Sequence, residues 1–108
     1  MKIQKFNMPD ISKQLKKAWT PIDVETVDSF VLRVAKFKGS YHWHKHEKED
    51  ELFIVINGKI KILTNFGDIE LSREEGIKIP KGVEHCPIAT QPSVVLMIEN
   101  LELNKEVK

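Results

Sequence analysis

Residues 39 to 58 read Gly39-Ser-Tyr-His-Trp-His44-Lys-His46-Glu-Lys-Glu-Asp-Glu51-Leu-Phe-Ile-Val-Ile-Asn-Gly58. If His44 and His46 lie on a β-strand, their side chains point to the same side, because alternate residues share a face. The polar run from residue 47 to 50 is turn-like, so Glu51 can open a second, apolar strand beside the two histidines. This stretch therefore predicts two imidazoles and one carboxylate at the same place.

A third imidazole comes from a second stretch, Gly76-Ile-Lys-Ile-Pro80-Lys-Gly82-Val-Glu-His85. Three imidazoles and one carboxylate suit a first-row divalent transition metal, because they combine nitrogen donors with one hard oxygen. The alternative is that the histidines are ordinary polar residues on a solvated rim. Glu51 argues against this alternative. The same face of its strand carries Phe53 and Val55, and an unpaired carboxylate buried among them would cost several kcal/mol.

The two stretches resemble the two sequence motifs of the cupin superfamily. The first has the order Gly, His-x-His, four residues, Glu, six residues and Gly, and the second has Pro-x-Gly-x-x-His after an apolar strand. Within the superfamily, the chain is most similar to small single-domain cupins that are often described as similar to mannose-6-phosphate isomerase. Where the family usually has Gly six residues before the Pro, this chain has Glu74.

The resemblance implies an all-β, single-domain fold, the double-stranded β-helix or jelly-roll barrel of the cupins, with a short N-terminal helix. It divides the chain into an N-terminal segment with this helix (residues 1–22), the barrel (23–104) and a charged tail (105–108). Together with the spacing, it predicts a divalent metal site made by His44, His46, Glu51 and His85. The ligand set suits Fe, Mn, Ni, Co or Zn, and the affinity order does not choose between them.

Turn residues divide the chain into short segments that are typical of a sandwich or closed barrel. One helix is expected at residues 10–18, capped by Asp10 and ended before Pro21. Strands are expected at residues 30–37, 52–56, 59–63, 69–71, 77–79 and 93–103. Asn57-Gly58 predicts a type I′ hairpin between the second and third of these strands, and Phe66-Gly67-Asp68 predicts another turn.

Two residues beside the predicted ligands have alternative interpretations. His42 shares strand parity with His44 and should face the same side, either as a second-shell catalytic acid or base near the metal or as an exposed residue. Glu84, next to His85, is either a hydrogen-bond acceptor for an imidazole N–H or exposed. The sequence alone leaves both pairs of alternatives open.

The remaining aromatic and sulfur-containing residues of this region are expected to pack. Tyr41 and Trp43 have the opposite parity to the histidines, which predicts that they lie outside the barrel or at an interface. Cys86 directly follows His85, and neighbouring residues of an extended chain point in opposite directions, so we expect a buried structural thiol. Three apolar residues could line a pocket or fill the core, namely Phe37, Phe53 and Val55.

Length, charge and cysteine content limit the classes of protein. The chain has 108 residues, which is one domain, and its formal net charge of +1 gives no field that favours nucleic acid or an anionic membrane. One cysteine excludes an intrachain disulfide and fits a reducing cytosol. The N-terminus has no apolar signal-peptide region, and the longest apolar run, Val94–Ile98, is far shorter than a membrane helix. We therefore expect a cytoplasmic protein.

Two of the expected strands are apolar on both faces, at residues 52–56 and 94–98. One face can fill the barrel, and the other must be covered by something else. Similar small cupins are commonly dimers, so we predict a homodimer. The alternative is a monomer in which residues 10–18 cover both strands.

Four protein ligands leave two positions of a six-coordinate ion open for a small molecule that chelates through two oxygens. The first hypothesis is therefore a metal-dependent enzyme with isomerase-, lyase- or dioxygenase-type chemistry on a small oxygenated metabolite. The second is a non-catalytic module that binds or senses a sugar, another small molecule or a metal. A third, a metal-free sugar-nucleotide isomerase or epimerase of cupin type, ranks last, because such proteins usually lack the full ligand set.

Overall fold

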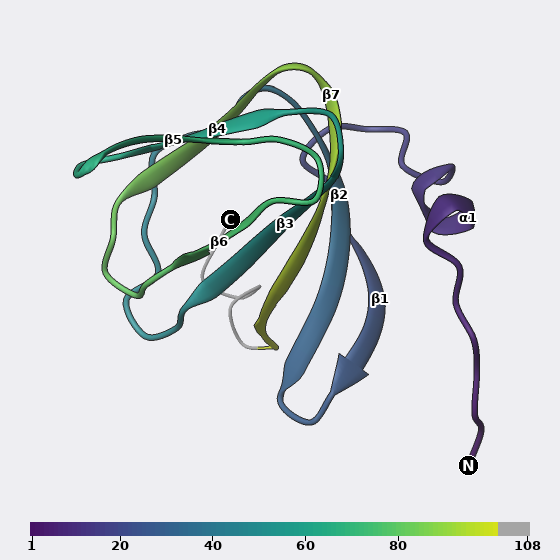
Figure 1. Cartoon of the computed structure of the whole chain (residues 1–108). Helices are drawn as coiled ribbons and strands as arrows, with labels where there is room; N and C mark the ends of the chain where they lie inside the picture. The colour runs from purple at the N-terminus through teal and green to yellow at the C-terminus, as the bar shows by residue number, and fades with distance from the viewer. Residues whose placement is uncertain (102–108) are drawn as a thin grey trace.

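The computed structural model describes residues 1–101, and it has the predicted all-β jelly-roll architecture with one short helix among these residues (Figure 1). Its elements, in chain order, are α1 (Met8–Ser12), β1 (Ile22–Val27), β2 (Phe30–Ser40), β3 (Glu51–Asn57), β4 (Ile60–Thr64), β5 (Gly67–Leu71), β6 (Gly76–Ile79) and β7 (His85–Asn100). None of the described helices is long and apolar enough to span a membrane.

The 16-residue strand β7 organises the barrel. It pairs with β2 along most of its length; on its other side, its C-terminal half pairs with β3 and its first residues pair with β4. The resulting order is β1-β2-β7-β3-β6, with β4 and β5 joined to β7 off this path. The sheet thus has two parts, one with β1, β2, β3 and β6 and the other with β4 and β5, and β7 belongs to both. The sheet therefore folds over on itself, as Figure 1 shows for β4 and β5 above β3 and β6.

The hydrophobic core lies between the two parts of the folded sheet. Strand β3 alternates buried and partly buried residues along its length, so that one face of β3 points into the barrel. Core filling, the second of the two interpretations above, accounts for Phe37, Phe53 and Val55. The buried cluster to which they belong also contains Ala35, Ile60, Ile62, Leu71, Ile79, Ala89, Val95 and Met97.

The predicted hairpin at Asn57-Gly58 is wrong. The turn exists, but β3 pairs with β6 and β7, and β4 pairs with β5 and β7. The turn instead carries the chain from one part of the sheet to the other. Gly58 has a φ of +93°, and a Cβ atom there would lie 2.3 Å from Ser93 Oγ on β7. The glycine therefore serves a close approach to β7, whereas the tight hairpin joins β4 to β5, where Thr64 pairs with Gly67.

The helix prediction is also wrong in its bounds. Asn7, not Asp10, caps the helix, because its Oδ1 accepts a hydrogen bond from the Asp10 N–H at 2.9 Å. The helix ends at Ser12 instead of residue 18. Short helices are marginal in water, and the following segment bonds to β2 instead, where the Trp19 N–H donates to the Lys36 carbonyl at 2.8 Å.

The ends of the barrel differ from the expected strands. β1 was not predicted, although it pairs with β2 along its whole length, with a bulge between Asp23 and Glu25. The closing strand was predicted at residues 93–103, but β7 begins at His85 and ends at Asn100. Residues 102 and 103 of that prediction, and the predicted tail at 105–108, lie outside the described residues.

Candidate metal centre

The structure brings together the four residues that the sequence predicted as ligands. One donor atom from each of His44, His46, Glu51 and His85 lies within 4.8 Å of the donor atoms of the other three. Glu51 is the first residue of β3 and His85 the first residue of β7, so that two strand ends supply half of the cluster. The other two come from the segment between β2 and β3.

The His-x-His pair reaches the cluster by a different route from the one expected. Apart from one isolated bridge at His44, residues 41–50 form no strand. The His44 N–H donates to the His85 carbonyl at 3.0 Å, and the His85 N–H donates back at 2.9 Å. The carbonyl of His46 accepts from the Gly82 N–H at 2.8 Å. Main-chain bonds to the second motif, rather than a regular strand, therefore hold the first motif in place.

The cluster is compact and mostly buried. The Oε1 atom of Glu51 lies 3.3 Å from His46 Nε2 and 3.7 Å from His85 Nε2. The ring centres of His44 and His85 are 4.3 Å apart. The exposed fractions are 0% for His85, 4% for His46 and 6% for Glu51, whereas His44 is half-buried. The solvent side of the cluster is therefore the side of His44.

Two main-chain carbonyls orient two of the imidazoles. His44 Nδ1 lies 2.9 Å from the His42 carbonyl, and His85 Nδ1 lies 2.9 Å from the Val83 carbonyl. Because a carbonyl oxygen only accepts, each Nδ1 carries the proton and donates. The Nε2 lone pairs of His44 and His85 are then free to bind a cation, which is the arrangement that metal-ligating histidines commonly have.

The local electrostatics favour the protonation states that a cation needs. Burial lowers the pKa of His44 to about 4, and the neighbouring His85 and His46 act in the same direction against the His42 carbonyl. For Glu51, burial raises the pKa, but the contacts with His46, His85 and Glu99 outweigh it and hold the pKa below its usual range. At neutral pH His44 is therefore uncharged and Glu51 is ionised.

The residues of the cluster fit a divalent ion. Glu51 Oε1, His85 Nε2 and His46 Nδ1 are buried side-chain atoms without a hydrogen-bond partner among the described residues. Leaving a buried polar atom unpaired costs about 1–3 kcal/mol. Metal–ligand bonds of about 2.1 Å place ligand atoms at most about 4.2 Å apart, so a small contraction of the cluster would close it around an ion. An ion there would satisfy two of the three unpaired atoms.

His42 and Glu84, for which the sequence left two interpretations open, are both exposed. The His42 imidazole stacks on Tyr41, with ring centres 3.9 Å apart, and its ring centre lies 5.3 Å from that of His44. The hydrogen-bond partner of His44 is the main-chain carbonyl of His42 and not its imidazole. Glu84 is exposed as well. Cys86 is buried, as expected for a structural thiol.

Tyr41 differs from the expectation that it packs away from the histidines. It is half-buried, and its ring lies edge-on to His44, with centres 5.3 Å apart, and near Trp19 at 4.9 Å. The parity argument failed because residues 41–43 are not in a strand. Burial raises the pKa of Tyr41, and the charges of Glu51 and Glu99 raise it further, so its phenol stays protonated. Trp43, which was expected to pack outside the barrel or at an interface, is exposed in the single chain.

Sequence reasoning missed one charged group inside the barrel. Arg33 and Glu99 are both buried and form an ion pair with an N–O distance of 2.8 Å. A signal was present in the sequence: Arg33 has the parity of the inward residues Val31 and Ala35, and Glu99 has the parity of Met97. A charged residue at an inward position of an apolar strand needs a buried partner.

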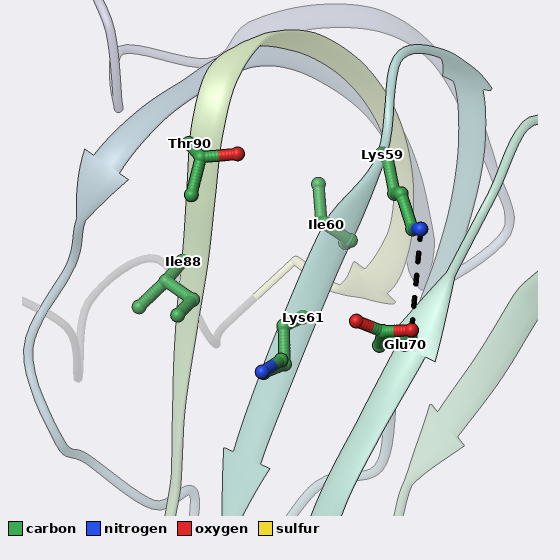
Figure 2. A pocket seen from close by; sticks show the side chains of 6 residues that line it. All are labelled: Lys59, Ile60, Lys61, Glu70, Ile88 and Thr90. Atoms are coloured by element: carbon green, nitrogen blue, oxygen red, sulfur yellow. Dashed lines mark ion pairs between the residues drawn. The ribbon is translucent and has the colours of Figure 1, made fainter.

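A pocket of about 210 Å³ lies elsewhere on the barrel, over β4, β5 and the first half of β7 (Figure 2). It contains none of the four clustered residues. Its charged side chains are on the surface, and Lys59 forms an ion pair of 4.0 Å with Glu70. The other residues that line it are Ile60, Lys61, Ile88 and Thr90.

Known proteins of similar sequence and structure cover most of the chain. The uncharacterised protein YdbB of Bacillus subtilis (strain 168) is 33% identical over 97 residues, which are 87% of this chain and 84% of that protein. A cupin-2 domain containing protein from Shewanella frigidimarina has a crystal structure with a TM-score of 0.86 and 32% identity, covering 88% of this chain and 93% of that one.

More distant structures share the fold alone. Hydroquinone 1,2-dioxygenase PnpCD, whose crystal structure holds Cd²⁺ and 4-hydroxybenzonitrile, has a TM-score of 0.74 at 18% identity and covers 87% of this chain and 71% of that one. The similarity to the mannose-6-phosphate isomerase-like group stays a prediction. Residues 30–99, however, match the family model described as "Cupin domain". The chain therefore belongs to the cupin domain family.

Proposed function

We propose that this cupin holds a divalent transition-metal ion and uses it to bind and transform a small oxygenated metabolite. A cluster of three imidazoles and a carboxylate in a cupin fold suggests a divalent metal, and the fold suggests small-molecule binding. The proposed ligands are His44, His46, Glu51 and His85. One observation carries the proposal: Glu51 Oε1 and His85 Nε2 are buried 3.7 Å apart, and neither has a hydrogen-bond partner among the described residues.

The ion and the side chains around it would have different roles in a reaction. When bound, the ion would supply Lewis-acid polarisation of a substrate oxygen or, as iron, redox chemistry with O₂. Phe53, whose ring centre is 6.4 Å from that of His85, excludes water from the inner side. The ring of Tyr41 lies edge-on to His44, and its phenol keeps a proton that it can donate to a bound oxygen atom. These features support isomerase-, lyase- or dioxygenase-type chemistry.

A non-catalytic binding or sensing role is the second candidate. The observation that favours it is the exposed imidazole of His42, because the one histidine predicted as an acid or base does not join the cluster. The phenol of Tyr41 separates the two roles. If the protein turns over a substrate, Tyr41→Phe should lower kcat, whereas in a binding module the same change should alter affinity alone.

The metal content of the purified protein tests whether the four proposed ligands bind an ion. Protein made without added metal should carry about one transition-metal ion per chain by elemental analysis. The double variant His44→Ala/His46→Ala should lose more than nine-tenths of it. His42→Ala is the matched control, because it removes an exposed imidazole from the same segment, and its metal content should be unchanged. Equal metal content in the wild type and the double variant would contradict the ligand assignment.

The substrate class can then be tested with small chelating probes. Cobalt(II)-loaded protein has visible absorption bands that respond to a new oxygen ligand. We expect α-hydroxy ketones, keto acids or diketones to shift these bands, and the corresponding mono-alcohols to leave them unchanged. A protein that binds the metal but responds to none of these probes would speak against a metabolite site.

We also propose that the protein is a homodimer. Leu32, Ile98 and Leu52 lie in one cross-strand row on the outer face of β2, β7 and β3. Ile98 and nearby Phe30 are exposed, although the N-terminal segment is present. Figure 1 places α1 beside β1 and β2, away from β3. Sedimentation equilibrium should give twice the chain mass of 12.5 kDa, and Ile98→Glu should convert the protein to monomers. A wild-type monomer would favour the alternative.

A further inference from the structure

Four aromatic rings form a continuous stack that runs from the barrel core to the surface. The ring centre of Trp19, in the segment before β1, lies 4.4 Å from that of Phe37 on β2 and 4.9 Å from that of Tyr41. The ring centre of Tyr41 lies 3.9 Å from that of His42. Phe37 is buried and His42 is exposed, so the stack has its inner end in the core and its outer end in solvent.

The outer half of the stack lies against the metal cluster. The ring centres of Tyr41 and His42 are each 5.3 Å from that of His44, the proposed ligand on the solvent side of the cluster. Residues 41–43 belong to no strand, so no neighbouring strand holds their side chains in register. Through Trp19, the N-terminal segment instead contacts the part of the chain that carries His44 and His46.

Trp19 is itself held by hydrogen bonds and by packing. Its main-chain N–H donates to the Lys36 carbonyl at 2.8 Å, and its indole Nε1–H donates to the Lys38 carbonyl at 2.9 Å. Its ring packs against the buried core cluster. Its φ is +62°, a left-handed conformation that is unfavourable for a bulky residue and persists only where the surrounding contacts impose it. The two hydrogen bonds to β2 and the ring contacts are such contacts.

We propose that Trp19 is a positioning residue of the metal site, because its indole, through Tyr41, fixes the segment that carries His44. This role rests on the metal site proposed above. Main-chain hydrogen bonds hold the backbone of the segment, from the Tyr41 N–H to the Pro87 carbonyl at 3.0 Å and between His44 and His85. The stack adds a side-chain contact to these bonds. His44 is then kept beside His85 before an ion binds, so that less of the segment has to be ordered on binding.

Trp19 lies outside the part of the chain that the family model matches, which is residues 30–99. On this proposal the N-terminal segment contributes to the metal site without supplying a ligand. The chain has two tryptophans, and the second, Trp43, is exposed and takes no part in the stack. Trp43 lies within the segment that carries the ligands, so the two tryptophans form a matched pair for an experiment.

Amide hydrogen exchange of the metal-free protein tests the proposal without a bound ion. In the wild type, the amides of Tyr41 and His44 should be protected, although residues 41–43 form no strand. Trp19→Leu removes the ring and should speed their exchange about tenfold through local opening of the segment. Trp43→Leu, the matched control, should leave both rates unchanged.

The amide of Val95, in the centre of β7, separates positioning from stability alone. Its rate should rise less than those of Tyr41 and His44 in Trp19→Leu, because it exchanges through opening of the whole barrel. If all three rates rise by the same factor, Trp19 merely stabilises the fold and the proposal is wrong. Unprotected Tyr41 and His44 amides in the wild type would also overturn it, as would unchanged rates in Trp19→Leu.

The affinity for cobalt(II), measured by titration of its visible bands, gives the second readout. It should fall about tenfold in Trp19→Leu. Trp19→Phe keeps a ring in the stack and should recover the affinity to within roughly threefold of the wild type. An equal loss in both variants would mean that the stack does not position His44, and the proposal would fail.

Two further outcomes are distinguishable. If Trp19→Leu does not fold, Tyr41→Leu breaks the same stack one ring further out and should speed exchange at the His44 amide about tenfold; an unchanged rate there would overturn the proposal. A wild-type protein that binds no cobalt(II) would instead contradict the proposed function, while its exchange rates would still show whether Trp19 holds the segment around His44.

Discussion

Two clusters of ionisable side chains are buried among the described residues, the metal cluster and the ion pair of Arg33 and Glu99, and their atoms are satisfied in different ways. In the metal cluster, Glu51 Oε1 and His85 Nε2 are buried without a partner among the described residues. In the ion pair of Arg33 and Glu99, the two side chains meet at 2.8 Å, and neither has a fully buried nitrogen or oxygen atom without a hydrogen-bond partner among the described residues. The metal cluster therefore has unpaired atoms that an ion could bind, whereas the ion pair needs no further partner. The first is a candidate for function, and the second for stability.

The ion pair should give the largest single effect on stability. Glu99→Leu leaves the Arg33 guanidinium buried with only the exposed Asp23 beside it, and removing one partner of a buried pair costs about 3–5 kcal/mol. Arg33→Met/Glu99→Leu should recover most of this loss. Urea unfolding of metal-free protein, followed by circular dichroism, measures both free energies.

The surface pair Lys59–Glu70, with an N–O distance of 4.0 Å, is the control for this experiment. Glu70→Leu removes a carboxylate from an exposed pair and should change the free energy of unfolding by less than about 1 kcal/mol. Equal losses at Glu99 and Glu70 would mean that burial adds nothing to the pair inside the barrel.

Removal of the metal tests the other polar group. A ligand that binds the folded state stabilises it by about 4 kcal/mol when its free concentration is 1,000 times its Kd. Chelation should therefore lower the free energy of unfolding of metal-loaded protein by about this amount. His85→Ala should abolish the difference between the loaded and chelated forms, because it removes a fully buried donor. If chelation still lowers the free energy of unfolding of His85→Ala, the distinction between the metal cluster and the ion pair does not hold.

The two groups also differ in how far the sequence alone could predict them. His44, His46, Glu51 and His85 lie in two short motifs whose spacing carries the information, so their convergence was predictable. The local geometry was not. The bridge between His44 and His85 depends on contacts between segments about forty residues apart, which no strand parity encodes. Tyr41 was misplaced for the same reason.

Predicting the ion pair from the sequence would have required the register of three strands. Arg33, Glu99 and Glu51 are far apart in the sequence and meet because β7 lies between β2 and β3. The Asn57-Gly58 turn shows the same limit, since its residues predict a turn but cannot tell which strands pair across it. The helix failed because residues after Ser12 bond to β2, a tertiary contact that outweighs the local pattern.

The stability of the metal-free protein should depend on pH because of a residue of the metal cluster. The pKa of His44 is about 4 in the folded protein and about 6.5 in the unfolded chain. Between these values the unfolded state binds the extra proton, so stability falls as the pH is lowered from 6.5 to 4. His44 is half-buried, and allowing for solvent screening the loss from this residue is about 1–2 kcal/mol. His44→Ala should flatten the curve in this window. An unchanged curve would contradict the assignment.

A substitution away from both polar groups gives the smallest expected effect. Glu74 lies in the turn before β6 with a φ of +72°, and its N–H donates to the Val55 carbonyl at 2.8 Å. A side chain in this left-handed conformation costs about 1 kcal/mol, part of which glycine returns as greater freedom of the unfolded chain. Glu74→Gly should therefore raise the free energy of unfolding by about 0.5 kcal/mol, measured by urea titration. Metal affinity should not change, because the turn contacts β3 through its main chain and not through Glu51. A change in affinity would mean that the metal cluster responds to the barrel as a whole, and the separation between the two polar groups would then have no functional meaning.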